Sequence, residues 1–290
     1  MAGRKLTISD FYEMKKEGKK ITWITAYDYP IASFAQASGM DMILVGDSLG
    51  MVVYGYNGTV SVTMDECIIH SKAVRRGAPD VFVVGDMPFG SYHTSDADAV
   101  ANAVRFVKEA NVDAIKLEGG ERVATRIKAI SDAGILVIGH VGLTPQSSAA
   151  LGGFKAQGRT AESAEAVIAD SIAVQKAGAR LLLVEAIPPE LAAAITKIVK
   201  IPVLGIGAGV DIDGQVMICG DILGYFQAFT PKFVKKYANV AEVIINAMKE
   251  YIADVRGSKF PGPEHTYSIL PEESGKFSEM LKKYMKQHIT

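Results

Sequence analysis

Short apolar runs alternate with amphipathic segments along most of the chain, and the alternation repeats about eight times. Most of the runs are followed by glycine or glutamate, and their continuous apolar character is typical of parallel strands that are buried on both faces. We expect strands at residues 21–25, 42–45, 81–84, 114–117, 135–138, 181–184, 203–206 and about 217–223.

The segments between these runs carry helix signals. Thr63-Met-Asp-Glu66 is a capping box, Ser95 precedes an acidic first turn, and Pro188-Pro189 suits the start of a helix. We expect helices at residues 8–17, 31–38, 63–75, 96–107, 121–133, 161–177, 189–199 and 240–255. Because buried strands alternate with helices, the pattern predicts an α/β fold, and eight such units favour a closed (β/α)8 barrel of the TIM type.

The chain changes character near Gly257. Residues 260–263, Phe-Pro-Gly-Pro, have the composition of a linker. Beyond them, an apolar stripe at helical spacing comprises Phe277, Met280, Leu281, Tyr284 and Met285. We therefore expect a single catalytic barrel domain at residues 1–256, followed at residues 257–290 by a linker and a C-terminal helical tail. The stripe must pack against the outside of the barrel or against a neighbouring subunit.

Composition narrows the possible partners and location. Lys and Arg total 31 against 32 Asp and Glu, so the chain has no basic excess to neutralise a nucleic-acid backbone. No run reaches the roughly 20 apolar residues that span a bilayer, and the first 20 residues lack an apolar signal core. We expect a cytoplasmic protein without nucleic-acid or membrane partners. Cys67 and Cys219 have no metal-site spacing and are expected to be buried free thiols.

Charged residues follow several predicted strands at the same point. Asp47, Asp86, Glu118 and Glu185 each come where an apolar run ends, and His140 follows the fifth run in the same way. In a barrel of this kind, catalytic residues lie at the C-terminal ends of the strands. Carboxylates gathered at one rim repel each other unless a cation or substrate lies between them. We therefore expect the active site at this rim.

The residue types at the rim indicate a magnesium site, because aspartate and glutamate supply the hard oxygen ligands that Mg²⁺ prefers. Lys116 precedes Glu118 by two residues, so strand alternation points both side chains to the same side, which suits an anionic substrate. Taken singly, each acid could equally be a helix cap, and His140 a buried histidine with internal partners. Gly205-Ile-Gly-Ala-Gly209 could mark close approach to a ligand or simple turn geometry.

Eight motifs in order carry a family resemblance. They are ITAYDYP at 24–30, LVGDSLGM at 44–51, AVRRGAP at 73–79, KLEGG at 116–120, GHVGLTPQS at 139–147, GGFKAQGR at 152–159, VEAIP at 184–188 and GIGAG at 205–209. In these motifs the chain resembles the 3-methyl-2-oxobutanoate (ketopantoate) hydroxymethyltransferase family from about Thr22 to His265. Beyond about Tyr267 the resemblance gives no support.

The resemblance implies a role for each matching residue. Asp47 and Asp86 would bind Mg²⁺, with Glu118 as a third acid at or beside the metal. Asp47, Ser48, Asp86 and Lys116 would contact the 2-oxo acid, His140 is placed with these substrate-binding residues, and Glu185 would be the general base. The family also implies a cytoplasmic enzyme of pantothenate biosynthesis, 5,10-methylenetetrahydrofolate as one-carbon donor, and a homo-oligomer, commonly a decamer.

Two other functions fit the same residues. A Mg²⁺-dependent lyase or mutase could act through the enolate of a different 2-oxo acid, since the same acids would stabilise it. A non-catalytic barrel could bind a ligand or serve in assembly. Use of a folate donor separates the first alternative from the transferase, and metal binding by the rim acids argues against the second.

Overall fold

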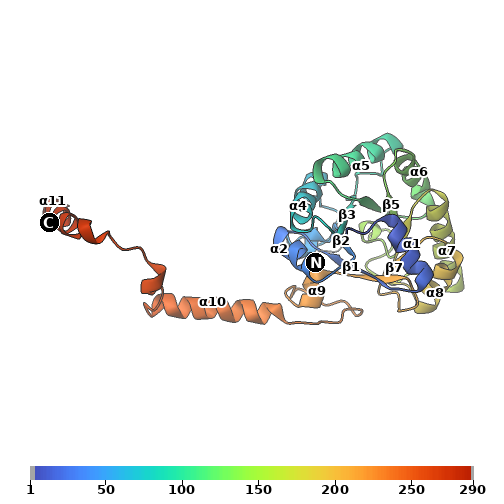
Figure 1. The fold of residues 1–290 in the computed structure, drawn as a ribbon. Helices are drawn as coiled ribbons and strands as arrows, with labels where there is room; N and C mark the ends of the chain where they lie inside the picture. Colours follow the sequence, from blue (N-terminus) through green and yellow to red (C-terminus); the bar gives the residue numbers. More distant parts are fainter. Residues whose placement is uncertain (1–3, 289–290) are drawn as a thin grey trace. The chain divides into compact units, whose positions relative to one another are not determined.

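The structure, a computed structural model, describes residues 4–288. The chain forms two compact units, Met1–Ala238 and Asn239–Thr290. The first unit is a closed barrel of eight parallel strands in sequence order (Figure 1). The strands are β1 (Ile21–Thr25), β2 (Met42–Val45), β3 (Phe82–Asp86), β4 (Ala114–Glu118), β5 (Val137–Gly142), β6 (Leu181–Glu185), β7 (Val203–Ile206) and β8 (Gly214–Met217). The predicted TIM-type fold is confirmed.

Helices surround the strands of the first unit (Figure 1). They are α1 (Ile8–Glu17), α2 (Tyr29–Ala37), α3 (Leu49–Val52), α4 (Met64–Gly77), α5 (Asp96–Ala110), α6 (Ala124–Asp132), α7 (Ala161–Lys176), α8 (Pro189–Ile198) and α9 (Cys219–Leu223). The capping box predicted at Thr63 and Glu66 begins α4, and the Ser95 side chain accepts a hydrogen bond from the Asp98 N–H at the start of α5. None of the helices within residues 4–288 is long and apolar enough to cross a membrane.

Strand alternation separates two apolar clusters. Ile115 and Leu117 of β4 point outward and join the large cluster between the strands and the helices, in which Cys67 and Cys219 are also buried as free thiols. Ala114, on the opposite face of β4, belongs to the cluster inside the barrel. Side chains at every second position of a strand therefore line the barrel interior.

Helix α1 fills one end of the barrel interior. Its Phe11 and Met14 are buried in the inner cluster, and the Phe11 ring meets the ring of Phe82, at the start of β3, edge to face at 5.1 Å. The N-terminal ends of the strands are thus covered by apolar side chains. Among the described residues, this leaves the C-terminal ends of the strands as the place for an interior site.

Two predicted strands need correction. The eighth strand is Gly214–Met217, and the segment predicted as that strand, 217–223, is mostly helix α9. Glycine is a poor strand former, but Gly214 pairs with Ile21 of β1, and a Cβ there would lie 2.3 Å from the Ile21 carbonyl oxygen. Close approach of β8 to β1 closes the barrel, and no local pattern reveals it. The fifth strand likewise begins at Val137 and continues through His140 to Gly142.

The second unit contains α10 (Val240–Arg256) and α11 (Ser274–His288). Neither helix has a buried residue, although each carries large apolar side chains. The exposed apolar residues of the two helices are Val243, Ile244, Ile245, Met248, Tyr251, Ile252, Val255, Phe277, Met280, Leu281, Tyr284 and Met285. The chain divides after residue 238, just before α10, whereas the predicted boundary at residue 256 lies at the C-terminal end of α10. The domain assignment stays a prediction.

Replacing Gly214 with alanine is expected to destabilise the barrel by about 1–3 kcal/mol, because the added methyl group would press on the backbone of Ile21. The midpoint of chemical denaturation measures the effect. Gly58→Ala is the matched control, since a Cβ at Gly58 meets nothing within 4 Å. Equal midpoints for the two variants would show that β1 and β8 do not approach each other this closely.

Deleting residues 273–290, which include α11, is expected to change the assembly state or lower the melting temperature, because the apolar stripe of this helix needs a partner surface. Mass in solution and thermal unfolding report the two effects. The prediction fails if both quantities equal those of the full chain.

Candidate active site

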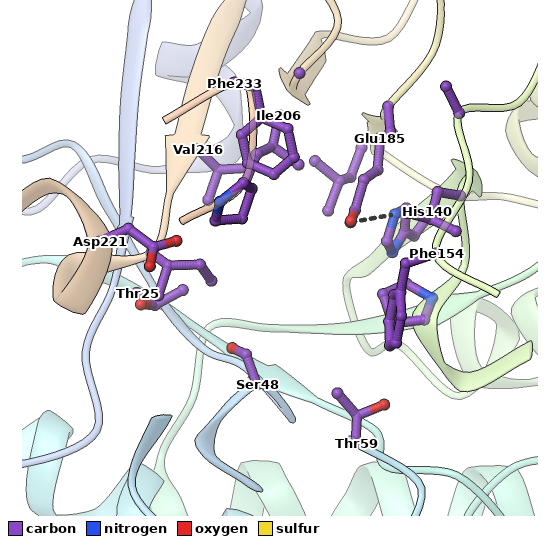
Figure 2. A pocket seen from close by; sticks show the side chains of 18 of the residues that line it. Thr25, Ser48, Thr59, His140, Phe154, Glu185, Ile206, Val216, Asp221 and Phe233 are labelled. Atoms are coloured by element: carbon purple, nitrogen blue, oxygen red, sulfur yellow. Dashed lines mark ion pairs between the residues drawn. The ribbon is translucent and has the colours of Figure 1, made fainter. Parts of the chain in front are cut away.

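All seven residues predicted for the site line a single cavity of about 1080 Å³ at the C-terminal ends of the strands. They are Asp47, Ser48, Asp86, Lys116, Glu118, His140 and Glu185. Figure 2 shows three of them, Ser48, His140 and Glu185, around this cavity. Other walls of the cavity come from β7, β8 and the segments that follow them. The sequence therefore identified a set of residues that the fold brings together.

Barrel register explains the convergence. Asp86 ends β3 directly opposite Lys116 of β4, and Glu118 of β4 lies opposite His140 of β5. These four side chains occupy the alternate positions that face the barrel interior, above inner-cluster residues such as Val84 of β3. Glu185, at the end of β6, follows Leu183 of the inner cluster in the same way.

Lys116 lies at the centre of a buried charge cluster. Its ammonium group donates hydrogen bonds to both carboxylate oxygens of Asp86, at 2.9 and 3.0 Å, and to Glu118 Oε1 at 3.1 Å. The backbone N–H of Asp47 donates to Asp86 Oδ2 at 3.0 Å, which places a third carboxylate beside the pair. The ammonium group thus joins two neighbouring strands, and Asp86 joins them in turn to the loop after β2.

The acids of this cluster titrate differently. Burial and the charge of Asp86 raise the pKa of Asp47 well above its ordinary value, and burial also raises the pKa of Asp86. Burial opposes ionisation of Glu118 as well, but Lys116 and His140 outweigh it and lower the pKa of Glu118 to about 2. Three carboxylates against one ammonium leave two negative charges if all are ionised, so the cluster has room for further positive charge.

The donor set fits a magnesium ion in its chemistry. Asp47 and Asp86 provide carboxylate oxygens, and Mg²⁺ is commonly held by one or two carboxylates with waters and substrate completing the octahedron. Within residues 4–288, no group of three or more His, Cys, Asp or Glu side chains is arranged to hold a metal. Glu118 instead receives hydrogen bonds from Lys116 and from the Gln146 N–H, and its assignment to the metal stays a prediction.

His140 connects the charge cluster to Glu185. Its Nε2 lies 3.2 Å from Glu185 Oε2, and its Nδ1 lies 3.6 Å from Glu118 Oε1 (Figure 2 shows the first contact). Neither ring nitrogen makes a hydrogen bond of good geometry within the described chain, so these are charge contacts. Burial and Lys116 lower the pKa of His140, but the two carboxylates raise it, with a net value of about 8. His140 therefore carries a positive charge near neutral pH, next to Glu185.

Two side chains that the sequence analysis missed brace the cluster. The Gln146 side-chain amide donates to Asp47 Oδ2 at 2.9 Å and to the Met87 carbonyl at 3.0 Å, while its oxygen accepts from the Tyr92 hydroxyl at 2.7 Å. Both residues are buried. Gln146 was visible only as part of the motif GHVGLTPQS, and Tyr92 carried no signal because it lies in an irregular segment after β3.

Ser48 stands at the cavity wall with a partner of its own. Its hydroxyl lies 2.8 Å from the Tyr27 hydroxyl, in the motif that follows β1. Tyr27 is buried, so the pair fixes the Ser48 side chain beside Asp47. This geometry agrees with the predicted contact of Ser48 with a substrate, which stays a prediction.

Similar solved structures share the fold at low sequence identity. A phosphonopyruvate hydrolase complexed with oxalate and Mg²⁺ superposes with a TM-score of 0.58 at 14% identity, covering 98% of this chain and all of that one. A 2,3-dimethylmalate lyase of the PEP mutase/isocitrate lyase superfamily gives a TM-score of 0.57 at 15% identity, covering 97% of this chain and 98% of the lyase. At these identities the likeness concerns the fold alone.

Relatives of higher sequence identity establish the family of this chain. A 3-methyl-2-oxobutanoate hydroxymethyltransferase from Alkaliphilus metalliredigens is 60% identical over 97% of this chain and 99% of its own. Its counterpart from Geobacillus kaustophilus is 50% identical over 91% of this chain and 95% of its own. The first match extends past Tyr267, so the tail too has a relative. The family model for ketopantoate hydroxymethyltransferase matches residues 5–263, and the chain therefore belongs to the ketopantoate hydroxymethyltransferase family.

Proposed function

We propose that this chain transfers a hydroxymethyl group from 5,10-methylenetetrahydrofolate to 3-methyl-2-oxobutanoate, giving 2-dehydropantoate, with Mg²⁺ as its metal. Membership of the family makes it a hydroxymethyltransferase of the pantothenate pathway. One observation carries the finer proposal: the Lys116 charge cluster and the His140–Glu185 pair meet in a single cavity.

The metal and the oxo acid belong at the charged end of this cavity. When bound there by Asp47 and Asp86, Mg²⁺ would supply Lewis acidity to the keto and carboxylate oxygens of the substrate. Lys116 adds a fixed positive charge next to Asp86, which attracts the substrate carboxylate and stabilises negative charge that develops on the keto oxygen. Ser48 offers a hydroxyl for a further hydrogen bond.

Glu185 takes the proton from C3 of the oxo acid. Its side chain is 16% exposed, against 1% for His140, so it is the member of the pair that a ligand in the cavity can reach. The electron pair left at C3 forms the enolate and attacks the methylene carbon of the folate, while one of the two C–N bonds of that carbon breaks and the released nitrogen takes up a proton. A water molecule then replaces the folate nitrogen on that carbon, so the new hydroxyl oxygen comes from water and tetrahydrofolate leaves. His140 Nε2, 3.2 Å from Glu185 Oε2, holds this carboxylate in position at the cavity wall.

A Mg²⁺-dependent lyase or mutase acting on another 2-oxo acid is the second candidate. The shared fold of the phosphonopyruvate hydrolase and the 2,3-dimethylmalate lyase favours it, because that barrel supports other reactions. The two candidates differ in their use of the folate donor. Product formation that depends on methylenetetrahydrofolate supports the transferase, and its absence would remove the proposal.

We propose also that the chain forms a homo-oligomer, for which the family resemblance suggests a decamer, and that it acts in the cytoplasm. The exposed apolar faces of α10 and α11 support self-association, because stripes of this kind are usually covered by a partner. A second copy of the chain is the partner that we propose.

The double variant Asp47→Asn, Asp86→Asn is expected to lose more than about 100-fold in Mg²⁺ affinity. Replacing residues that only hydrogen-bond to metal ligands typically costs about 10- to 100-fold, and replacing the ligands themselves should cost more. Titration calorimetry measures the affinity, and circular dichroism shows whether the barrel remains folded. Asp80→Asn, at an exposed position away from the cavity, is the control. A folded double variant with undiminished affinity would contradict the metal site.

Glu185→Gln is expected to slow exchange of the C3 proton of 3-methyl-2-oxobutanoate by about 10²- to 10⁴-fold, since the amide cannot accept the proton. Substrate affinity should change little. Proton exchange is followed by NMR in heavy water without folate, and Glu190→Gln, which is exposed at the start of α8, serves as control. Exchange at the wild-type rate would assign the base elsewhere.

A further inference from the structure

The cavity has a second half that the oxo-acid chemistry does not use. Its volume of about 1080 Å³ slightly exceeds the usual range for ligand sites, about 300–1,000 Å³. A small oxo acid at the Lys116 cluster would leave most of this space free. The wall on the other side comes from β1, β7, β8 and the segment after them, and its residues are mainly apolar, among them Ile206, Val216, Phe226, Phe229 and Phe233.

One carboxylate interrupts this apolar wall. Asp221, in α9, is only 5% exposed, and its carboxylate points into the cavity on the side opposite His140 and Glu185 (Figure 2). Within residues 4–288 it makes no side-chain hydrogen bond and no ion pair; burial raises its pKa, and the charge of Lys236 lowers it only in part. A buried acceptor without donors is costly unless a ligand supplies them.

The surroundings of Asp221 define the kind of ligand. A carboxylate accepts two parallel N–H donors, the pattern of an amino group beside a ring N–H. Phe226 and Phe229 pack edge to face at 5.4 Å, and both line the cavity with Phe233. Phe233 lies over the end of β7, where a Cβ at Gly207 would come within 2.8 Å of its ring. Aromatic side chains in such a wall suit a flat ring.

The mouth of the cavity carries positive charge. Arg159 and Lys232 line it and are exposed, and within the described chain neither forms an ion pair. A ligand whose flat ring reaches Asp221 could place an anionic tail beside these two cations.

We propose that Asp221 and the aromatic wall of Phe226, Phe229 and Phe233 bind the 2-amino-4-oxo pyrimidine ring of the reduced pterin donor. This assignment rests on the proposed function, which names a folate as donor. The carboxylate accepts the N–H groups of the 2-amino substituent and of the adjacent ring nitrogen. Asp221 is thus a substrate-binding residue for the second substrate and takes no part in proton removal from the first.

Asp221→Asn tests the proposal, because the amide replaces one acceptor with a donor that faces the amino group of the ring. Affinity for tetrahydrofolate, measured by calorimetry, should fall about 10- to 100-fold, the loss expected for a hydrogen bond to a charged group. Affinity for 6-methyltetrahydropterin, which lacks the tail, should fall by the same factor. Asp211→Asn, exposed and outside the cavity, should change neither.

A second measurement separates this role from general damage to the site. Exchange of the C3 proton of 3-methyl-2-oxobutanoate without folate should be unchanged in Asp221→Asn. In full turnover, KM for methylenetetrahydrofolate should rise while KM for the oxo acid stays constant. Loss of proton exchange together with pterin affinity would make Asp221 a structural residue and overturn the assignment.

The remaining outcomes distinguish the two proposals. If the wild-type protein binds tetrahydrofolate and Asp221→Asn binds it equally well, the pterin assignment falls and the proposed function stands. A loss confined to tetrahydrofolate, with 6-methyltetrahydropterin unaffected, would also overturn the assignment, because the contact would be with the tail. A wild-type protein that binds no tetrahydrofolate would overturn both.

Discussion

The buried ammonium group of Lys116 determines what the rest of the cavity can be. It holds Asp86 and Glu118 directly above the apolar inner cluster of the barrel, and all three side chains are almost fully buried. Removing one partner of such a pair commonly costs about 3–5 kcal/mol, because the remaining charge is left without compensation. The cluster is therefore stable only as a set. Its surplus of carboxylates gives it an affinity for added positive charge.

The bracing of this set comes from loops rather than strands. Gln146 contacts Asp47 through its side chain and Glu118 through its backbone, and Tyr92 holds Gln146 in place. These hydrogen bonds fix the Asp47 carboxylate, which stands on a loop and has no strand to orient it. A site that stabilises developing charge works best when its groups are already in position. The motif GHVGLTPQS thus contributes His140 and Gln146 to one network.

Much of the fold and the charged half of the site could be predicted from the sequence because both depend on local patterns. Strands at 21–25, 42–45 and 203–206 end where predicted, and strand alternation was enough to place Lys116 and Glu118 on one side. β8 was misplaced because its strand character depends on pairing with β1 through Gly214. Tyr92 and Asp221 were missed because their roles arise from burial beside distant segments, which no pattern around them records.

The two walls of the cavity place the proposed base at a boundary. Strands β3, β4 and β5 contribute charged side chains, whereas β7, β8 and β1 contribute Ile206, Val216 and Thr25. Glu185 ends β6, between the two walls. It contacts His140 of β5 on one side and pairs in register with Ile206 of β7 on the other. The proposed oxo acid has a polar end that suits the charged wall and an isopropyl end that does not. If the substrate carboxylate lies near Lys116, its C3 points away from the charged wall and toward the apolar wall. Glu185, at the boundary of the two walls, can then reach the C3 proton. A flat donor bound against the apolar wall can reach the C3 carbon.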